Sequence, residues 1–241
     1  GRIRGIDRPA IASAFPTTAH KRAVLIDSGA NIECEPANLL EFAYLGVAYV
    51  ERVFDVKRPK VGLVSNGEEP GKGTDLVKQV HKLLAASDLD FVGNIEGKDV
   101  LKYHADVVVT DGFTGNVMLK LAEGVAEFFL GEVRQSLRSA WHYKLAGLVA
   151  RPAFRALARR VDSAEMGGAP LLGVNGAVLI AHGRSDERAI RNAIRSAALM
   201  AEQDVAGAIR AHIASRIERG SLRHRLSKTF RHGGGAASET A

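Results

Sequence analysis

The side chains best suited to chemistry in this chain of 241 residues gather in four polar loops that contain glycine. The loops span residues 65–74, 93–99, 110–116 and 181–185, and each follows a short apolar run typical of a buried strand. In open α/β sheets, ligands bind beyond the carboxyl ends of the strands. We therefore expect these loops to contribute to a ligand site.

The loop of residues 65–74 has the make-up of a phosphate cradle. Glycines, Lys72 and Thr74 precede a helical pattern, and backbone amides at a helix start together with a lysine can bind phosphate. It is not a Walker A motif, because the glycine spacing differs and Gly73 follows Lys72. The alternative is an ordinary glycine-rich turn with a helix cap. The predicted phosphate contacts here are Asn66, Gly67, Lys72 and Gly73.

The loop of residues 110–116 offers groups for catalysis. A strand ends at Asp111, and two following glycines let the backbone approach a ligand closely. Asn116 opens a helical pattern, and Lys120 lies four residues later on the same helix face. The alternative is a plain strand-to-helix turn with Asn116 as its N-cap. The predicted contacts here are Asp111, Gly112, Thr114, Gly115, Asn116 and Lys120.

His182 ends another apolar run, where a histidine serves as a base or, more commonly, as a hydrogen-bonded structural residue. The chain has no Gly-x-Ser-x-Gly elbow, and Cys34, its one cysteine, has no evident histidine partner. No cluster of histidine and acidic residues has metal-ligand spacing, so we expect no metal and no cofactor. A transfer reaction would then use direct attack by a bound substrate. The predicted catalytic residues are Asp111, Asn116, Lys120 and His182.

The elements that must position these loops alternate between strands and helices. Continuous β-branched runs at residues 23–26, 61–64, 106–109 and 177–180 predict strands covered on both faces, as in parallel sheets. Helical patterns lie between them, beginning near residue 39 and spanning residues 75–85, 116–129 and 186–213. The predicted fold class is therefore α/β. Residues 117–161 contain no strand pattern, and Pro152 predicts two helices with a break at residues 150–152.

Composition excludes several classes of protein. Hydrophobic residues make up 46% of the chain and charged residues 25%, which argues against a disordered chain. No apolar run approaches the ~20 residues that a membrane span needs. A single cysteine excludes an intrachain disulfide and a cysteine-based metal site.

The net charge of +6 is unevenly distributed. Residues 131–160 carry +6 and residues 205–241 carry +5, which leaves −5 for the remainder. This asymmetry indicates an acidic partner, an anionic membrane or nucleic acid. The first segment mixes basic and apolar side chains, as a surface for a membrane or a dimer partner would; a helix that covers its own core is the plainer alternative. The predicted contacts are Arg134, Arg138, Trp141, Leu145, Leu148 and Phe154.

The loops, in their order along the chain, resemble one family. The matching stretches are residues 4–10, 27–31, 93–97, 105–116, 167–176 and 182–185. Together they are similar to the phosphate acyltransferases of bacterial phospholipid synthesis, the acyl-carrier-protein:phosphate acyltransferases or PlsX family. The resemblance covers residues 1–213, and it places a site in these loops. It adds Asn94, Glu96, Gly97, Gly168 and Asn175 to the predicted substrate contacts.

This resemblance implies a Rossmann-like three-layer fold of the isopropylmalate dehydrogenase and phosphate acetyltransferase type, with an inserted helical hairpin at residues 117–161. It implies a cytoplasmic homodimer that associates peripherally with the membrane. The implied reaction transfers a fatty acyl group from acyl carrier protein to inorganic phosphate, and glycerol-3-phosphate acyltransferase uses the product. Lys72, Asn116 and Lys120 would contact the phosphate or the oxyanion, while Asp111 and His182 would orient groups or move a proton.

One departure from the family concerns length. Family members carry a further N-terminal stretch that supplies sheet strands and one wall of the cleft. We therefore expect residues 1–213 to form an incomplete acyltransferase domain of a truncated or fragmentary member. Residues 214–241 are expected to be a basic, disordered tail.

Two other functions remain open from the sequence. One is a phosphate acetyl- or butyryltransferase that acts on coenzyme A thioesters. The other is a non-catalytic basic module that binds a membrane or nucleic acid through the tail. The tail has no recognised nucleic-acid motif and Phe230 is its one aromatic residue, so we expect no nucleic-acid partner. The basic tail residues are Arg223, His224, Arg225, Lys228 and Arg231.

Overall fold

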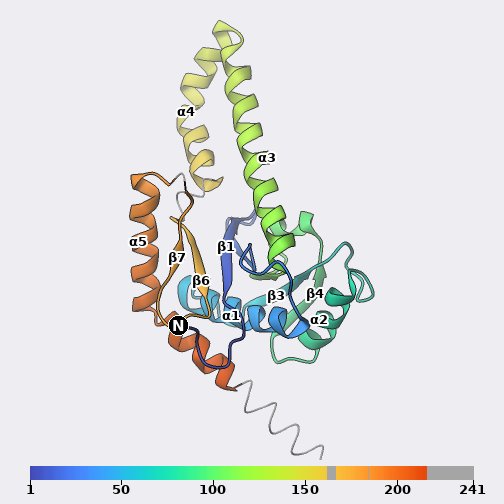
Figure 1. Cartoon of the computed structure of the whole chain (residues 1–241). Coiled ribbons are helices and arrows are strands. Elements are labelled where there is room, and N and C mark those ends of the chain that lie inside the picture. The colour runs from blue at the N-terminus through green and yellow to red at the C-terminus, as the bar shows by residue number, and fades with distance from the viewer. Residues whose placement is uncertain (162–166, 184, 216–241) are drawn as a thin grey trace, which may run out of the picture.

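A computed structural model describes residues 1–161, 167–183 and 185–215, and these form an α/β fold around one mixed sheet (Figure 1). The described part of the sheet has seven strands in the order β4-β3-β5-β2-β1-β6-β7. The strands are β1 (Ala10–Pro16), β2 (Arg22–Ile26), β3 (Lys60–Val64), β4 (Asp90–Ile95), β5 (Val107–Val109), β6 (Ala169–Leu172) and β7 (Leu179–Ile180). The helices are α1 (Pro36–Phe54), α2 (Asp75–Ala85), the 3₁₀ helix η1 (Gly97–Lys102), α3 (Gly112–Arg138), α4 (Trp141–Val161), α5 (Glu187–Glu202) and residues 205–215.

The parallel half of the sheet contains β2, β5, β3 and β4. Three of the runs predicted to be strands lie here, as β2, β3 and β5. Their central side chains are fully buried, as continuous apolar runs require. The carboxyl ends of these four strands all lead to one edge of the sheet, where the loops of residues 27–31, 65–74, 96–99 and 110–112 begin.

The other half of the sheet is antiparallel, which differs from the prediction. β1 pairs with both β2 and β6, and β6 pairs with β7. The run at residues 177–180 forms only the two-residue edge strand β7, where Ile180 remains 43% exposed. The prediction of a strand covered on both faces was wrong there, because Ile180 stays 43% exposed on this short strand at the end of the described sheet.

Helices cover both faces of the parallel half and make three layers, as predicted. α1 and α2 pack on one face, against side chains such as Val24, Leu63 and Val107. The opposite face meets η1 and the base of α3 through a second core cluster that includes Leu25 and Val108. The site loops are therefore anchored on a rigid, buried framework.

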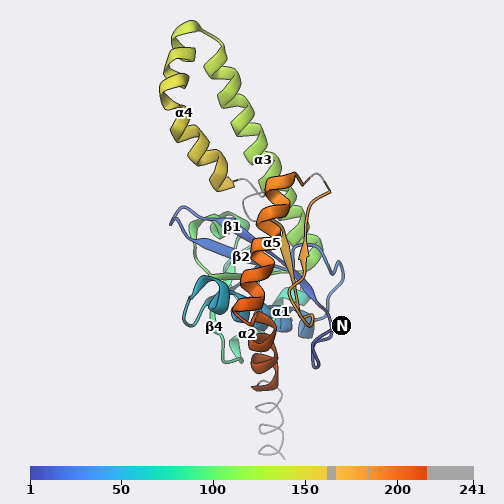
Figure 2. The same ribbon diagram turned by 90° about the vertical axis from the view of Figure 1, so that its left-hand side faces the viewer.

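Helices α3 and α4 form a hairpin that projects beyond the sheet (Figures 1 and 2). The break lies at residues 139–140 and not at residues 150–152, because Pro152 is accommodated inside α4. Ser139 ends α3 with its own hydroxyl, which donates to the Ser136 carbonyl at 2.8 Å in place of a continuing helical bond. α3 also begins at Gly112, five residues before the predicted start of the hairpin.

The helix predicted at residues 186–213 is two helices. α5 ends at Glu202, Asp204 adopts a positive φ of 45°, and a second helix follows at residues 205–215. His212 in this second helix lies 2.9 Å from Glu51 of α1, between Nε2 and Oε2. The predicted tail beyond residue 215, with its basic cluster, lies outside the described residues. Within the described part, no helix is both long and apolar enough to cross a membrane.

Candidate functional site

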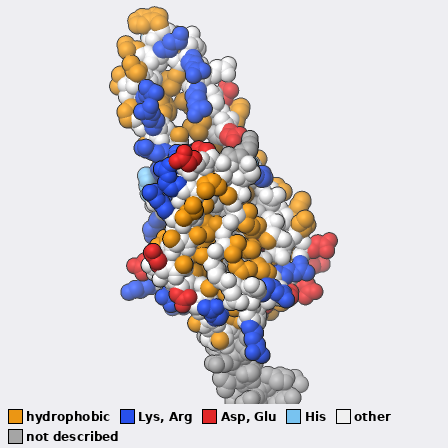
Figure 3. All heavy atoms as spheres, turned by 60° about the vertical axis from the view of Figure 1, so that its left-hand side comes forward, with side chains coloured by type: hydrophobic (Ala, Val, Ile, Leu, Met, Phe, Trp, Pro, Cys, Tyr) orange, Lys and Arg blue, Asp and Glu red, His pale blue; other side chains and the backbone are white. Residues whose placement is uncertain are grey.

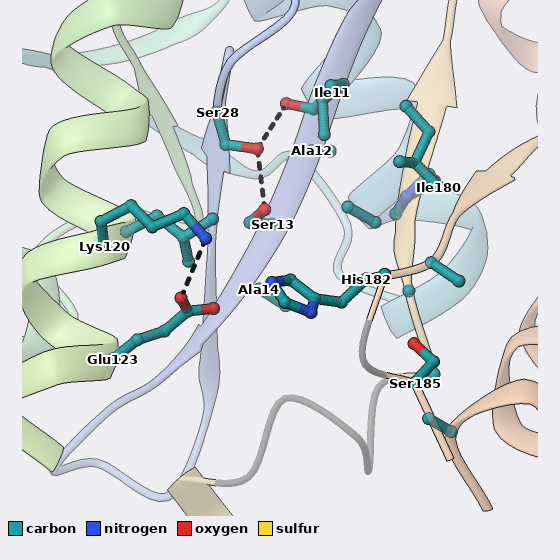
Figure 4. A pocket seen from close by; sticks show the side chains of 18 of the residues that line it. Ile11, Ala12, Ser13, Ala14, Ser28, Lys120, Glu123, Ile180, His182 and Ser185 are labelled. Carbon is teal, nitrogen blue, oxygen red and sulfur yellow. Dashed lines mark hydrogen bonds and ion pairs between the residues drawn. The ribbon is translucent and has the colours of Figure 1, made fainter. Parts of the chain in front are cut away.

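A cavity of about 600 Å³ opens between the antiparallel half of the sheet, the side of α3 and the start of α5 (Figure 4). Its walls come from β1 and Ser28, from α3, and from residues of the segments 167–170, 180–183 and 185–189. Three of the predicted site residues, Lys120, His182 and Gly168, line it together. They lie far apart in the sequence, so the fold brings them together.

Lys120 and Glu123 form the α3 wall of the cavity. Their Nζ and Oε2 atoms are 3.4 Å apart, and both side chains line the cavity. Asn116 precedes Lys120 by about one helical turn, roughly 6 Å along the same face. The Asn116 side chain packs beside Gly29, where an added Cβ would lie 3.6 Å from it. Asn116 thus borders the cavity without being part of its lining.

His182 enters the cavity from the segment that follows β7 (Figure 4). Its carbonyl accepts the Ser185 N–H at 2.9 Å, which turns the chain toward α5. Asp186 then caps α5 by accepting the Ala189 N–H at 2.8 Å. This short turn fixes the backbone that presents the imidazole.

The start of α3 is pressed against the loop that follows β2. A Cβ at Gly112 would lie 2.5 Å from the Asn31 carbonyl oxygen, and one at Gly115 would lie 1.9 Å from the Asp27 carbonyl oxygen. Both glycines are therefore required for packing against the protein's own backbone; a ligand contact for either stays a prediction.

The N-cap of α3 is Asp111 and not Asn116, so the cap alternative named the wrong residue. The Asp111 carboxylate accepts the N–H and the hydroxyl of Thr114, each at 2.8 Å. These contacts hold the Asp111 side chain in place at the carboxyl end of β5. Its catalytic role stays a prediction.

The loop after β3 lies apart from the cavity lining. The Lys72 side chain folds over Gly67, where its Cγ would lie 2.8 Å from an added Cβ. Gly73 has a positive φ of 93° and leads to Thr74, which caps α2 by accepting the Val77 N–H. The predicted phosphate contacts of this loop, Asn66 among them, stay predictions.

Residues of β4 and of η1 help to line a second, smaller cavity of about 490 Å³. Asn94 lines it, donates to the Glu69 carbonyl and lies 2.9 Å from His81 Nδ1. Glu96 forms an ion pair with Lys98, while Gly97 approaches the Met118 methyl group of α3. The hydrogen bond that Lys98 donates to the Glu96 carboxylate raises the pKa of Lys98.

Asn175 lies on another part of the surface. Its side chain donates to the Arg2 carbonyl at 3.0 Å and accepts from Arg210 at 3.1 Å. These bonds connect the first residues of the chain to the helix at 205–215. The structure thus gives Asn175 a structural role and places it outside the lining of both cavities.

Several polar residues of the cavity were missed from the sequence. Ser13, Ser28, Glu123 and Arg188 all line it. Ser13 belongs to β1, which has small, weakly apolar side chains and no strand signal. Ser28 lies inside a stretch that carried the family resemblance, directly after a buried strand, and that position is the signal that could have identified it.

The hairpin is exposed and carries apolar and basic side chains together. Trp141 is 77% exposed, Leu145 58% and Leu148 63%, whereas Phe154 is half-buried. Arg134 and Arg138 are exposed on α3. Figure 3 shows hydrophobic and Lys or Arg side chains side by side over the hairpin, and a separate hydrophobic patch on the body below it.

No group of three or more His, Cys, Asp or Glu side chains within the described ranges is placed to hold a metal ion.

Comparisons with known proteins agree with this architecture. Residues 1–208 match the family described as "Fatty acid synthesis protein". The "Phosphate acyltransferase" of Myxococcus xanthus is 49% identical over 208 residues, which are 85% of this chain and 59% of that protein. The protein of the same name from Helicobacter pylori is 47% identical over 205 residues, 85% of this chain and 60% of that protein. The chain therefore spans about three fifths of the length of these relatives.

The fold also resembles a solved structure, a phosphotransacetylase from Streptococcus pyogenes. The two share 17% sequence identity with a TM-score of 0.51, over 86% of this chain and 56% of that one. This likeness confirms the predicted fold type. With the family match over residues 1–208, it leads to one conclusion: the chain belongs to the fatty acid synthesis protein family, as its resemblance to the phosphate acyltransferases predicted.

Proposed function

We propose that this chain is the part of an acyltransferase that moves a fatty acyl group from acyl carrier protein to inorganic phosphate. The observation that carries the proposal is the meeting of Lys120 and His182 in one cavity that also has apolar walls. A cation and a group able to move a proton suit phosphate, while apolar walls suit the acyl end of a thioester. The names of the relatives support transfer to phosphate.

The chemistry needs no covalent enzyme intermediate. A phosphate oxygen attacks the thioester carbonyl carbon, so that a C–O bond forms and the C–S bond breaks. Lys120 would offset the charge of the phosphate, and we assign the stabilisation of the oxyanion to Asn116, one helical turn away at the border of the cavity. His182 takes the proton that the phosphate loses and returns it to the departing thiolate. The products are acyl phosphate and the free thiol of the carrier.

The remaining length of the relatives would complete the site. This chain matches 59% of the Myxococcus xanthus protein. The outer face of α5 leaves Ile190 43% and Ile194 66% exposed, and β7 is the last strand of the sheet among the described residues. An additional segment packed on this face would cover Ile190 and Ile194 and would add a further wall to the cavity beside the start of α5.

A direct assay tests this function. Acyl phosphate would be trapped with hydroxylamine after incubation of acyl carrier protein thioester with inorganic phosphate. Two forms would be assayed. One is this chain of 241 residues, and the other is a longer form that matches its relatives in length. We expect phosphate-dependent product in the longer form, with little in this chain alone. Absence of product from both forms, with every thioester, would contradict the proposal.

A second candidate function is transfer from coenzyme A thioesters, which the fold likeness to a phosphotransacetylase favours. The same assay separates the two, because a coenzyme A enzyme would prefer short acyl-coenzyme A over the carrier thioester. The proposal expects the opposite preference.

The hairpin of α3 and α4 would dock the protein. Its net charge of +6 over residues 131–160 complements an acidic carrier protein and an anionic bilayer. The protein would be cytoplasmic. The exposed apolar side chains of its hairpin, including Trp141 and Leu148, would insert into the surface of the membrane. We further propose that the protein is a homodimer, which light scattering would check. Its acyl phosphate product would be used by a glycerol-3-phosphate acyltransferase.

A further inference from the structure

Two serine hydroxyls form the β-sheet side of the cavity beside Lys120 and His182 (Figure 4). Ser13 projects from β1, and Ser28 is the second residue after β2. Their Oγ atoms are 2.7 Å apart, and Ser28 Oγ lies 3.2 Å from the Ile11 carbonyl oxygen. Ser28 is only 4% exposed, whereas Ser13 is half-buried.

The position of this pair follows from the local sequence. Ala12 and Ala14 belong to the core cluster on the opposite face of β1, whereas Ser13 shares its face with Ile11 and Phe15. Ser28 is held by its own N–H, which donates to the Ile11 carbonyl at 2.9 Å. The Asp27 carboxylate anchors the same turn, because it accepts N–H groups of Ile11 and Gly29. The pair is therefore built on a rigid frame.

The two hydroxyl protons can be arranged in two ways. In the first, Ser28 donates to the Ile11 carbonyl and Ser13 donates to Ser28, so Ser13 offers only lone pairs to the cavity. In the second, Ser28 donates to Ser13, and Ser13 directs its proton into the cavity. The second arrangement gives up only the longer 3.2 Å bond, and the Ile11 carbonyl keeps the Ser28 N–H.

The charge around the cavity selects between these arrangements. Lys120 approaches from α3 with His182 across the cavity from it, and the lining also holds Arg188 against the carboxylates of Glu123 and Asp186. The two cations offer partners to an anionic ligand. Glu123 Oε2 is 3.4 Å from Lys120 Nζ and partly offsets its charge. An anion beside Lys120 would need further hydrogen-bond donors. In the second arrangement the Ser13 oxygen accepts the Ser28 proton, so the Ser13 O–H is left to donate to the ligand.

We propose that the Ser13 hydroxyl donates a hydrogen bond to the phosphate substrate and that Ser28 positions it for that purpose. This proposal rests on the proposed function, since it assigns a binding residue to the same cavity. Ser13 is the contact residue; Ser28 acts through Ser13.

Steady-state kinetics of acyl phosphate formation test the proposal in the full-length protein. Ser13→Ala should raise the KM for phosphate about tenfold or more, because a hydrogen bond to a charged group is lost. The KM for the acyl carrier thioester should stay within about twofold of wild type. Ser28→Ala should have a smaller effect, and the double variant should equal Ser13→Ala, as expected when one residue acts through the other.

Two comparisons separate binding from structure. Ser13→Thr keeps a hydroxyl and should retain a low KM for phosphate, whereas Ser13→Val, of the same shape, should lose it. Ser87→Ala is the control. The Ser87 hydroxyl makes a hydrogen bond of its own, to the Leu84 carbonyl, but Ser87 lies outside the cavity.

If the wild type forms acyl phosphate, the proposed function stays intact. Three results would then overturn the inference about Ser13. They are an unchanged KM for phosphate in Ser13→Ala, a parallel rise in both KM values, and a fall in kcat alone. The last would mean that the hydroxyl contacts the thioester oxygen and not phosphate. A wild type that makes no acyl phosphate would instead contradict the proposed function.

Discussion

Among single residues, Asp27 has the largest influence on the frame of the site. It is fully buried at the end of β2, and its Oδ1 accepts three backbone N–H groups while Oδ2 accepts the backbone and side-chain N–H groups of Asn31. A buried carboxylate satisfied in this way is strongly stabilised, and it fixes the local loop conformation. The loop of residues 27–31 can therefore support both Ser28 and the start of α3.

Cys34 lies beside this loop and should be chemically inert. Burial raises the pKa of the Cys34 thiol to about 11, from 9.0, and the charges of Asp27 and Asp111 act in the same direction. A rise of two units lowers the thiolate fraction about a hundredfold at pH 8, because the proton is held until the pH approaches 11. Alkylation by iodoacetamide at pH 8, followed by mass spectrometry, should be far slower in the folded protein than in urea. Equal rates would contradict the assignment.

Helix α3 packs tightly against the loop after β2, and Gly115 lies at this contact. Gly115→Ala should destabilise the protein by about 2 kcal/mol or more, because its Cβ would lie 1.9 Å from the Asp27 carbonyl oxygen. Gly124→Ala, on the same helix but with no atom within 4 Å, should stabilise it by about 0.5–1 kcal/mol. Urea unfolding midpoints compare the two. The account fails here if both variants shift the midpoint in the same direction.

The hairpin is the element with the clearest surface role. Leu148→Glu should abolish most flotation with vesicles rich in phosphatidylglycerol, because it places a charge where the proposed contact is apolar. Leu101→Glu, at a 44% exposed site in η1, is the matched control on the body of the molecule and should float like wild type. Unchanged flotation of Leu148→Glu would leave the apolar face of the hairpin to a protein partner.

Local sequence patterns predicted the buried parallel strands and the main helices, with α2 at its observed bounds, and missed the antiparallel strands β1 and β6. β2, β3 and β5 are continuous apolar runs, and they were found. β1 and β6 were not, because alanine, serine and proline give little strand signal. Pro152 suggested the wrong break, because the Ser139 hydroxyl ends α3 earlier.

The site was predicted in part for the same reason. Lys120 and His182 stood out by residue type and by their position after predicted strands. Their meeting in one cavity depends on how β1 and β6 extend the sheet, and no local pattern contains that information. Ser13 was missed because it lies on a strand that was itself missed.

For the whole molecule, charge and length have separate consequences. The basic excess lies on the hairpin and in residues 205–241, while the remainder, which holds the cavity, is acidic at −5. Docking and catalysis are therefore assigned to different parts of the chain. The open side of the cavity and the apolar face of α5 agree with a chain that matches 59% of its Myxococcus xanthus relative.

The central claim is that acyl transfer to phosphate takes place in the cavity lined by Lys120. The most direct measurement is kcat/KM for phosphate in Lys120→Ala against Lys78→Ala, in the full-length protein. Lys120 and Lys78 each lie three residues from a carboxylate that they approach, to 3.4 and 3.5 Å, but only Lys120 lines the cavity. We predict a fall of about a hundredfold or more for Lys120→Ala, as expected for the loss of a charge that stabilises the transition state, and less than a twofold change for Lys78→Ala. Equal activity of a folded Lys120→Ala variant and the wild type would contradict the account.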